Sequence, residues 1–336
     1  MSEGNKNNFQ SSLVSGLLAP VWMLNRRQVI FSARSFHLVY FGVFASVSSI
    51  ISMSLFYYYV ISKGIVINYS LWVIFGLPII MNLICAKLFH IFSVGFPKFK
   101  KNQLKYLNET SFYNQGGMLG IAVAMVVIYF LTGIPGFVIF DGTVYGCTLA
   151  LFFGRLGCLN YGCCIGRPTE NGLGVAYTSP DSKIARTFPD LIGIKLIPVQ
   201  LYSALINFGI FLVMTISIHY FPYDGLIGLI FVFLYNLKRV IIQPYRIKES
   251  SNNFNYRLVA FLIMFFLSGI ILLFIFSGEI FFLPDPSKFQ FSVTNYFRYS
   301  LFSPGLAGPV IVCSTITFLA YGVHGKRLGS HISAVE

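Results

Sequence analysis

Residues Pro198–Tyr220 read PVQLYSALINFGIFLVMTISIHY, an apolar run without Asp, Glu, Lys or Arg. Such a run is long enough to cross the hydrocarbon core of a bilayer as one α-helix. Further runs of this kind lie at Phe36–Ile61, Val66–Phe92, Phe112–Ile134, Asp141–Tyr161, Leu226–Ile242, Leu258–Leu283 and Pro304–Val323. The sequence therefore predicts an all-α membrane protein with about eight transmembrane helices.

The composition supports a membrane protein. Of the 336 residues, 56% are hydrophobic and only 10% are charged, whereas about 25% of the residues in soluble domains are charged. So few polar residues do not cover a water-facing surface, and lipid must cover part of it. The net charge of +13 indicates contact with anionic lipid headgroups and a preferred orientation, and no nucleic-acid partner is expected.

The polar segments divide the chain into three parts. Residues 1–35 form a polar tail and a short amphipathic segment, which we expect to lie on the membrane interface. Residues 36–250 form the core, and residues 251–336 add further transmembrane helices and a C-terminal tail. The longest polar insertion, residues 162–197, is rich in Gly, Pro, Thr and Asp. It is too short for a separate domain, so we expect a small cap between the fourth and fifth spans.

The basic residues are distributed unevenly. With eight spans, both termini and the loops after spans two, four and six share one face, and most of the basic loop residues lie there. The positive-inside rule then predicts a multi-pass protein of the cell membrane with both termini in the cytoplasm. The same basic face is also suited to gathering anionic lipid.

Three basic residues, Arg155, Lys238 and Arg239, fall within the apolar runs or at their ends. An ionised side chain in a bilayer is costly and marks a functional site by default. Asp141 opens the fourth run, about 14 residues or roughly 20 Å of helix away from Arg155, and so belongs to the opposite face. An anionic ligand is then the natural partner, because the planar guanidinium suits phosphate. Backbone carbonyls, or snorkelling to the surface, are the alternatives.

The cysteines fall into two groups. Cys85, Cys147 and Cys313 stand alone in apolar runs, as buried inert thiols do. The others, Cys158, Cys163 and Cys164, cluster where the fourth span leaves the membrane. Four interpretations remain open for the cluster: a zinc site lacking an evident fourth ligand, a disulfide, a thiol acting as acid or base, or packing beside the site. We expect no metal and no cofactor.

Four motifs in order resemble those of the prolipoprotein diacylglyceryl transferase family. GRLGCLNYGCCIGR at Gly154–Arg167 resembles its signature, which begins Gly-Arg-x-Gly-Asn and ends Gly-Arg. GGMLG at Gly116–Gly120 resembles its His-Gly-Gly-x-x-Gly segment, and IPVQLY at Ile197–Tyr202 its His-Pro-x-Gln-x-Tyr segment. Tyr235, Arg239 and Arg246 match its Tyr-x-x-x-Arg-x-x-x-Glu-x-x-Arg pattern. Tyr40 or Phe41 matches the Tyr-Gly of its first span.

The resemblance implies a reaction. The family transfers the diacylglyceryl group of phosphatidylglycerol to a cysteine of a lipoprotein precursor, and glycerol phosphate leaves. Arg155 and Arg239 would bind the phosphate and stabilise charge as the C–O bond breaks, while Tyr235 positions the headgroup. The candidate catalytic residues are Arg155, Arg239 and Tyr235, with Cys158 and Cys163 added as thiols beside them that could act as acid or base. The implied substrate-binding residues are Gln115, Gly116, Gly117, Tyr40, Gly166, Arg167, Gln200, Tyr202 and Arg246.

The sequence also departs from the family pattern. Gln115 and Ile197 replace two histidines, and Gln243 replaces a glutamate. Cys158 replaces the asparagine of the signature, and Cys163 replaces an acidic residue. Glutamine is no general base near neutral pH. The donor side of the site is thus retained, while the residues that handle protons are replaced.

These departures leave other functions open. A related enzyme with a different acceptor, or a phospholipid binder or transporter without catalysis, would also retain both arginines. A redox or metal protein centred on the cysteines is a third class. The family's site opens away from the cytoplasm, whereas the charge rule places the matching face of this chain inside.

Overall fold

The computed structural model describes residues 25–67, 71–92, 114–170, 174–220, 223–247, 256–276, 292–298 and 303–325. The long helices in these residues are α2 (Tyr40–Ser62), α3 (Leu71–His90), α6 (Asn114–Thr132), α7 (Gly136–Tyr161), α9 (Val199–Tyr220), α10 (Leu226–Ile242), α11 (Tyr256–Phe276) and α13 (Pro304–Gly322). Six of them are long and apolar enough to cross a membrane, and α6 and α11 contain shorter apolar stretches. The predicted all-α membrane fold is confirmed, with one long helix at each predicted run.

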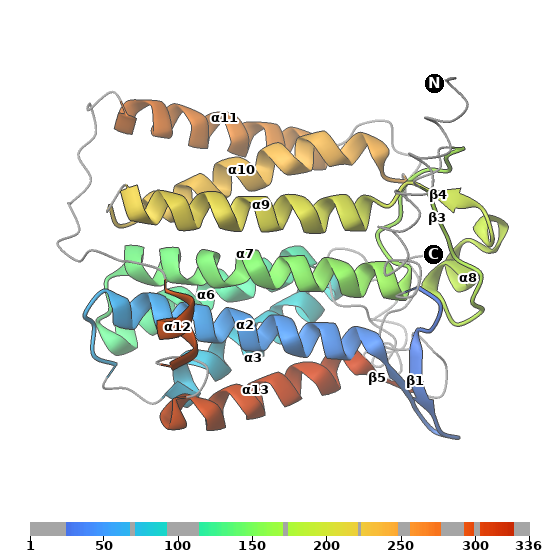
Figure 1. The fold of residues 1–336 in the computed structure, drawn as a ribbon, viewed down its shortest axis with the longest axis horizontal. Coiled ribbons are helices and arrows are strands. Elements are labelled where there is room, and N and C mark those ends of the chain that lie inside the picture. Colours follow the sequence, from blue (N-terminus) through green and yellow to red (C-terminus); the bar gives the residue numbers. More distant parts are fainter. Residues whose placement is uncertain are drawn as a thin grey trace, which may run out of the picture.

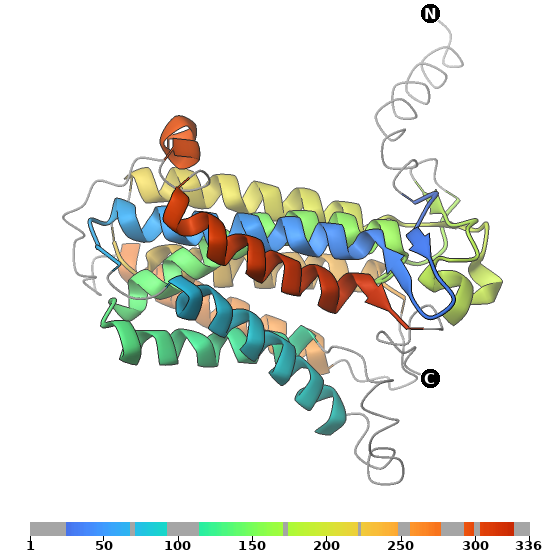
Figure 2. The ribbon, with the colours of Figure 1, turned by 90° about the horizontal axis from the view of Figure 1, so that it is seen from below.

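The helices form a bundle with its long axes roughly aligned. In Figure 1, α11, α10, α9, α7, α2 and α13 lie in this order across the view, and each contacts its neighbour. Figure 2 shows α3 and α6 together on one side of this row, where α3 packs on α6 and α13. Helix α7 lies at the centre, because it contacts α2, α6, α9 and α10.

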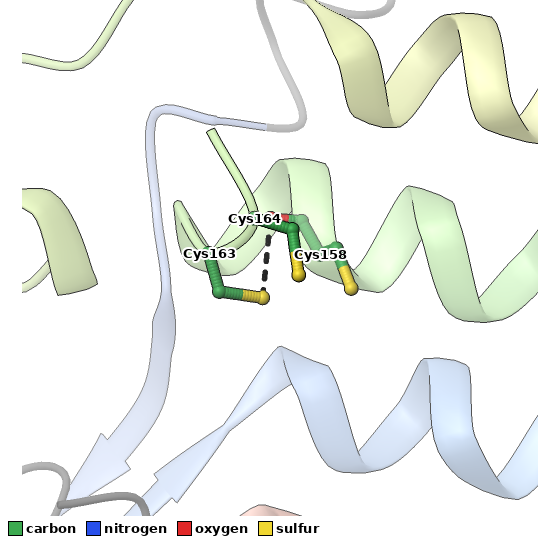
Figure 3. A group of neighbouring side chains, drawn as sticks. All are labelled: Cys158, Cys163 and Cys164. Atoms are coloured by element: carbon green, nitrogen blue, oxygen red, sulfur yellow. Dashed lines mark hydrogen bonds between the residues drawn. The ribbon is translucent and has the colours of Figure 1, made fainter. Parts of the chain in front are cut away.

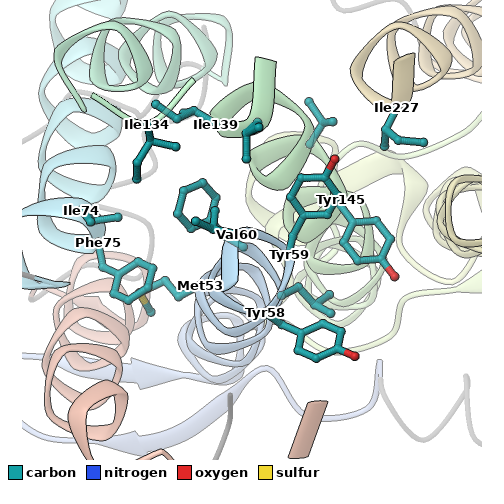
Figure 4. Close-up of a cluster of buried hydrophobic side chains, with 14 of the residues drawn as sticks. Met53, Tyr58, Tyr59, Val60, Ile74, Phe75, Ile134, Ile139, Tyr145 and Ile227 are labelled. Carbon is teal, nitrogen blue, oxygen red and sulfur yellow. The ribbon is translucent and has the colours of Figure 1, made fainter. Parts of the chain in front are cut away.

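Small residues and aromatic rings hold the bundle together. A side chain at Gly146 of α7 would collide with the backbone carbonyl of Ser52 in α2, so α2 and α7 approach as closely as backbones allow. Tyr59 and Tyr145, both almost fully buried, fill the space between these helices and belong to the large apolar cluster shown in Figure 4. Phe130 is 77% exposed, as expected for a side chain that faces lipid.

The insertion between the fourth and fifth spans forms a folded cap at one end of the bundle (Figure 1). It contains β3 (Val175–Ala176), α8 (Lys183–Thr187), η2 (Pro189–Leu191) and β4 (Lys195–Leu196), with β3 antiparallel to β4. Its own core consists of Ile165, Val175, Tyr177, Ile184 and Leu196. Burial raises the pKa of Tyr177, so its hydroxyl stays protonated and donates a hydrogen bond to the carbonyl of Leu159 at 2.8 Å. The predicted cap is confirmed.

The first span begins later than predicted. The run was expected to be helical from Phe36, but β2 (His37–Val39) pairs with β1 (Val29–Ser32) and with β5 (Val323–His324), and the helix begins at Tyr40. The apolar run therefore includes a strand, because its first residues pair with backbone from two distant segments. Both ends of the described chain thus lie beside the cap. Residues 1–24 of the predicted interfacial segment lie outside the described residues.

Asp141 lies far from Arg155, as expected, and has partners of its own. The backbone N–H groups of Gly225 and Gly228 each donate to its carboxylate at 2.7 Å, and the Tyr59 hydroxyl donates at 3.3 Å. The carboxylate of α7 therefore caps the N-terminus of α10, where negative charge is stabilised. Lys63 and Asp224 form an ion pair of 3.0 Å at the same end.

Candidate functional site

Three cationic side chains from two adjacent helices gather near the cap. Arg155 lies close to the C-terminal end of α7, and Lys238 and Arg239 lie at the C-terminal end of α10. The Arg155 guanidinium is near enough to interact electrostatically with the Tyr235 hydroxyl and the Lys238 amine. The structure thus brings together the three basic residues that the sequence placed in or at the ends of the spans.

Tyr235 organises two of these cations. The Nε and Nη2 atoms of Arg239 donate to the Tyr235 hydroxyl at 3.2 and 2.8 Å. The amine of Lys238 lies 3.9 Å from the centroid of the same ring, a cation–π contact that fixes both groups. Tyr235 is only 6% exposed. The structure thus shows Tyr235 positioning two cations, while its predicted role in positioning the headgroup stays a prediction.

Lys238 was singled out from the sequence as a charge at the end of a span, but neither Lys238 nor Asn207 was named as a catalytic or substrate-binding residue. Lys238 is 2% exposed, and its amine donates to Oδ1 of Asn207 at 2.5 Å. The Nδ2 atom of Asn207 is buried and has no hydrogen-bond partner in the described part of the chain. The spacing gives a sequence signal for Asn207, since Gln200 and Asn207 lie about two helical turns apart and hence on one face of α9.

Among the described residues, no carboxylate pairs with the basic side chains of this region. Within the described ranges, Lys63–Asp224 is the one ion pair between side chains, and it lies at the opposite end of the bundle. In the described structure, the neighbours of the three basic side chains of this region include thiols, Tyr235 and Asn207. Three neighbouring cations in a partly desolvated site repel one another unless an anion binds there.

The predicted cysteine cluster forms a compact set of thiols beside Arg155. The sulfur atoms of Cys158, Cys163 and Cys164 all lie within 4.8 Å of one another, and all three residues are half-buried (Figure 3). The Cys163 thiol donates to the carbonyl of Cys158 at 3.9 Å, and Nε2 of Gln200 donates to the carbonyl of Cys163 at 2.8 Å. All three are free thiols.

The two thiols outside the helix differ in acidity. Hydrogen bonds with Cys158 and Cys163 hold the pKa of the Cys164 thiol well below its ordinary value, and Arg155 and Arg246 act in the same direction. The hydrogen bond with Cys158 raises the pKa of the Cys163 thiol, and its contact with Cys164 adds to the effect. Within the cluster, Cys164 is therefore the thiol that loses its proton more readily than Cys163.

Backbone pairing links the cap to the end of α10. Gly166 forms an antiparallel bridge with Arg246, and the N–H of Arg167 donates to the carbonyl of Tyr245 at 2.9 Å. A side chain at Gly166 would collide with the backbone carbonyl of Ile197, so only glycine fits between these segments. Arg167 itself is exposed. Gly166, Arg167 and Arg246 thus lie together beside the thiols.

A groove of about 380 Å³ opens next to this junction. Its walls come from the start of α9, the end of α10 and the cap, and they are mainly apolar. The lining residues are Thr169, Gly174, Ile197, Pro198, Tyr202, Ile206, Ile241, Ile242 and Tyr245. Tyr202, a predicted substrate-binding residue, is 36% exposed and lines this groove.

The remaining predicted site residues have other neighbours in the described structure. Gly116 packs against the backbone of α3 at Cys85, and Gly117 packs against Asn82. The side chain of Gln115 lies outside the described part of the structure. Tyr40 begins α2 at the cap end. Its neighbour Phe41, the alternative match, packs on the ring of Tyr161 at the end of α7, with 5.7 Å between ring centroids.

Comparison with known proteins agrees with these features. The sequence model of the prolipoprotein diacylglyceryl transferase family matches residues 28–275, well over half of the chain. A phosphatidylglycerol–prolipoprotein diacylglyceryl transferase of Dehalococcoides mccartyi is 24% identical over 230 residues, which cover 68% of this chain and 85% of that protein.

Two clostridial proteins match shorter segments. The transferase of the same name from Clostridium tetani is 31% identical over 112 residues, covering 33% of this chain and 42% of that protein. Phosphatidylglycerol–prolipoprotein diacylglyceryl transferase 2 of Clostridium perfringens is 38% identical over 74 residues, which cover 21% of this chain and 26% of that protein. The match of the family model over most of the chain decides the assignment: this chain belongs to the prolipoprotein diacylglyceryl transferase family.

Proposed function

We propose that this protein transfers the diacylglyceryl group of an anionic, phosphatidylglycerol-like phospholipid to the cysteine thiol of a lipoprotein precursor, with release of glycerol phosphate. One observation carries this proposal: Arg155, Lys238 and Arg239 lie together, and no carboxylate of the described residues pairs with them. The names of the relatives supply the donor and the acceptor.

The cations fit the donor phosphate. A guanidinium binds phosphate oxygens through two parallel N–H groups. Arg155 on α7 and Arg239 on α10 approach from two helices, so both can bind one phosphate between them. As the C–O bond breaks, charge builds up on the leaving phosphate, and cations fixed in a dry site stabilise that charge best. The unpartnered amide N–H of Asn207 supplies a further donor near Lys238.

The groove fits an acyl chain of the donor. Its apolar walls at Ile206, Ile241 and Ile242 belong to helices of the membrane part, and burying alkyl groups there is favourable. The groove adjoins the junction where Gly166 and Arg246 pair, so a lipid in the groove places its headgroup toward the cap. We assign Gly166, Arg167, Gln200 and Arg246 to the mouth of the site, where the acceptor enters.

We further propose that both termini lie in the cytoplasm, on the same side as the cap. The distribution of basic residues supports this orientation. The pairing of β1 and β2 with β5 brings both ends of the described chain to the cap, as expected for an even number of spans.

The test is an incubation of the purified protein with radiolabelled phosphatidylglycerol and a peptide that carries a lipoprotein cysteine motif, following both lipid and peptide. We expect a lipidated peptide and released glycerol phosphate. A peptide with serine in place of its cysteine is the control for the acceptor. Arg34→Ala, which removes an exposed cation on the hairpin beside the cap, is the control for charge.

The other outcomes separate the competing functions. Release of glycerol phosphate with an unmodified peptide would indicate the same donor chemistry with another acceptor. Tight binding of phosphatidylglycerol without any release would indicate a lipid binder on the same scaffold and would overturn the proposal.

A further inference from the structure

The three thiols near Arg155 have the spacing of ligands around one metal ion. A Zn–S bond of about 2.3 Å places the sulfurs of a shared ion roughly 4 Å apart. Here all three sulfur atoms already lie within 4.8 Å of one another, and the three residues are half-buried. A small movement of side chains therefore completes a site with three sulfur ligands.

The backbone is folded so that adjacent cysteines face the same point. Neighbouring residues in an extended chain point in opposite directions. Here the chain turns through left-handed conformations at Gly162, with φ of 78°, and at Cys164, with φ of 57°. Cys164 is the one non-glycine residue with positive φ in the described ranges, a conformation that costs energy. The turn directs Cys163 and Cys164 back toward Cys158 on the helix (Figure 3).

The charges near the cluster also suit a metal. Three thiolates around a divalent ion carry a net charge of −1, and the Arg155 guanidinium beside them carries +1. Within the described ranges, the group of potential metal-binding side chains at this point consists of thiols alone. Thiolate ligands select thiophilic ions such as zinc and disfavour magnesium or calcium.

We propose that Cys158, Cys163 and Cys164 bind one thiophilic divalent ion of the zinc class, and that its open fourth position binds the acceptor cysteine as a thiolate. The second half rests on the proposed function. Three protein ligands with one open position are typical of catalytic zinc sites. A thiol that coordinates zinc is deprotonated outright, which supplies the nucleophile without a general base at Gln115.

The transfer step forms one C–S bond and breaks one C–O bond. The acceptor S–H loses its proton to water when its sulfur binds the ion. A sulfur lone pair then forms the C–S bond to the glyceryl carbon that carries the phosphate oxygen. The C–O bond breaks, and its electron pair leaves on glycerol phosphate beside Arg155 and Arg239. One proton is released for each diacylglyceryl group transferred, and no oxidant or reductant is consumed.

The first test is a titration of the full-length protein in detergent with cadmium, under reducing conditions, following the ultraviolet absorbance of cadmium–thiolate bonds. We expect one ion per chain. Cys158→Ser, Cys163→Ser and Cys164→Ser should each weaken binding at least about a hundredfold, since each removes one of three ligands. Cys147→Ser is the matched control, because it alters a thiol on the same helix whose partner is the Ser52 hydroxyl.

Equal cadmium binding by the wild type and all three cluster variants would overturn the proposal. Thermal unfolding of each variant identifies any loss that comes from misfolding. In addition, bound zinc can be measured in the wild-type protein before and after dialysis against a chelator. This measurement needs no variant.

The second test adds the acceptor peptide to the cadmium-loaded protein. A fourth thiolate should raise the absorbance by about one third, whereas the peptide with serine in place of cysteine should leave it unchanged. No increase with the cysteine peptide would overturn the acceptor half of the proposal.

Radiolabelled donor then separates this inference from the proposed function. Loss of transfer in chelator-treated protein, with recovery on adding zinc, supports both. Full transfer by protein shown to be free of metal would overturn the metal site and leave the proposed function intact. Cadmium and thiol binding without transfer under any condition would support the site and contradict the proposed function.

Discussion

The two ends of α7 carry charges of opposite sign whose surroundings differ. Asp141 is fully buried and accepts hydrogen bonds from two backbone N–H groups and the Tyr59 hydroxyl. Arg155 at the other end lies among thiols, Tyr235 and other cations, without a carboxylate in the described residues. A buried charge with complete protein partners serves the fold, whereas neighbouring charges of one sign with no carboxylate partner among the described residues indicate a ligand.

The same contrast predicts how each end responds to substitution. Asp141 is part of the native structure, so its loss should reduce stability. The cations repel one another, so their loss should leave stability unchanged or raise it while binding and transfer fall. Stability and activity measured together on each variant therefore distinguish the two ends.

The largest expected effect is at the arginines. Arg155→Ala or Arg239→Ala should lower kcat/KM for transfer by about 10²–10³ or more, because each removes a cation that stabilises the leaving phosphate. The measurement is release of labelled glycerol phosphate per folded protein, with Arg34→Ala as the control. Transfer within tenfold of wild type in both variants would refute the assignment of this end as the donor site.

Asp141→Ala should lower the free energy of unfolding by about 2–4 kcal/mol, because it removes the acceptor of two buried backbone N–H groups and of the hydrogen bond from the Tyr59 hydroxyl. Thermal unfolding in detergent measures this change. The protein that remains folded should transfer at nearly the wild-type rate. If transfer were lost at unchanged stability, the two ends would not differ as described.

Lys238→Met tests the third cation. We expect KM for the phospholipid to rise about tenfold, which corresponds to about 1.4 kcal/mol, while kcat changes less. The apo protein should be slightly more stable, because a buried charge is replaced by an apolar side chain of similar size. Unchanged KM together with lower stability would make Lys238 a structural residue paired with Asn207.

The smallest expected effect is at Gln115. Its amide is no base near neutral pH, so Gln115→Ala should lower transfer by no more than about threefold. A loss as large as that of Arg155→Ala would show that acid–base or binding chemistry still depends on this position.

Much of the fold follows from the sequence, because a transmembrane helix is specified by length and apolar composition alone. The exceptions are elements that depend on contacts between segments distant in the sequence. The strand at His37–Val39 forms by pairing with β1 and β5, and local hydropathy carries no sign of such partners.

The site is only partly predictable for the same reason. Arg155 and Arg239 stand out in the sequence because charge is costly in lipid. The contact between Lys238 and Asn207 joins α10 to α9, and the convergence of the thiols depends on a left-handed turn at Cys164. The structure shows that Gly116 and Gly117 pack against α3. The positions of these glycines in the sequence do not reveal whether they serve such packing or headgroup binding.

Arg155, Lys238 and Arg239 form the proposed binding site for the donor phosphate. Native mass spectrometry of the protein released from mixed phosphatidylglycerol and phosphatidylethanolamine vesicles tests it directly. We predict that the wild type retains one phosphatidylglycerol in preference, and that the Arg155→Ala/Arg239→Ala double variant loses this preference while Arg34→Ala keeps it. Equal retention of phosphatidylglycerol by the double variant and the wild type would contradict the claim.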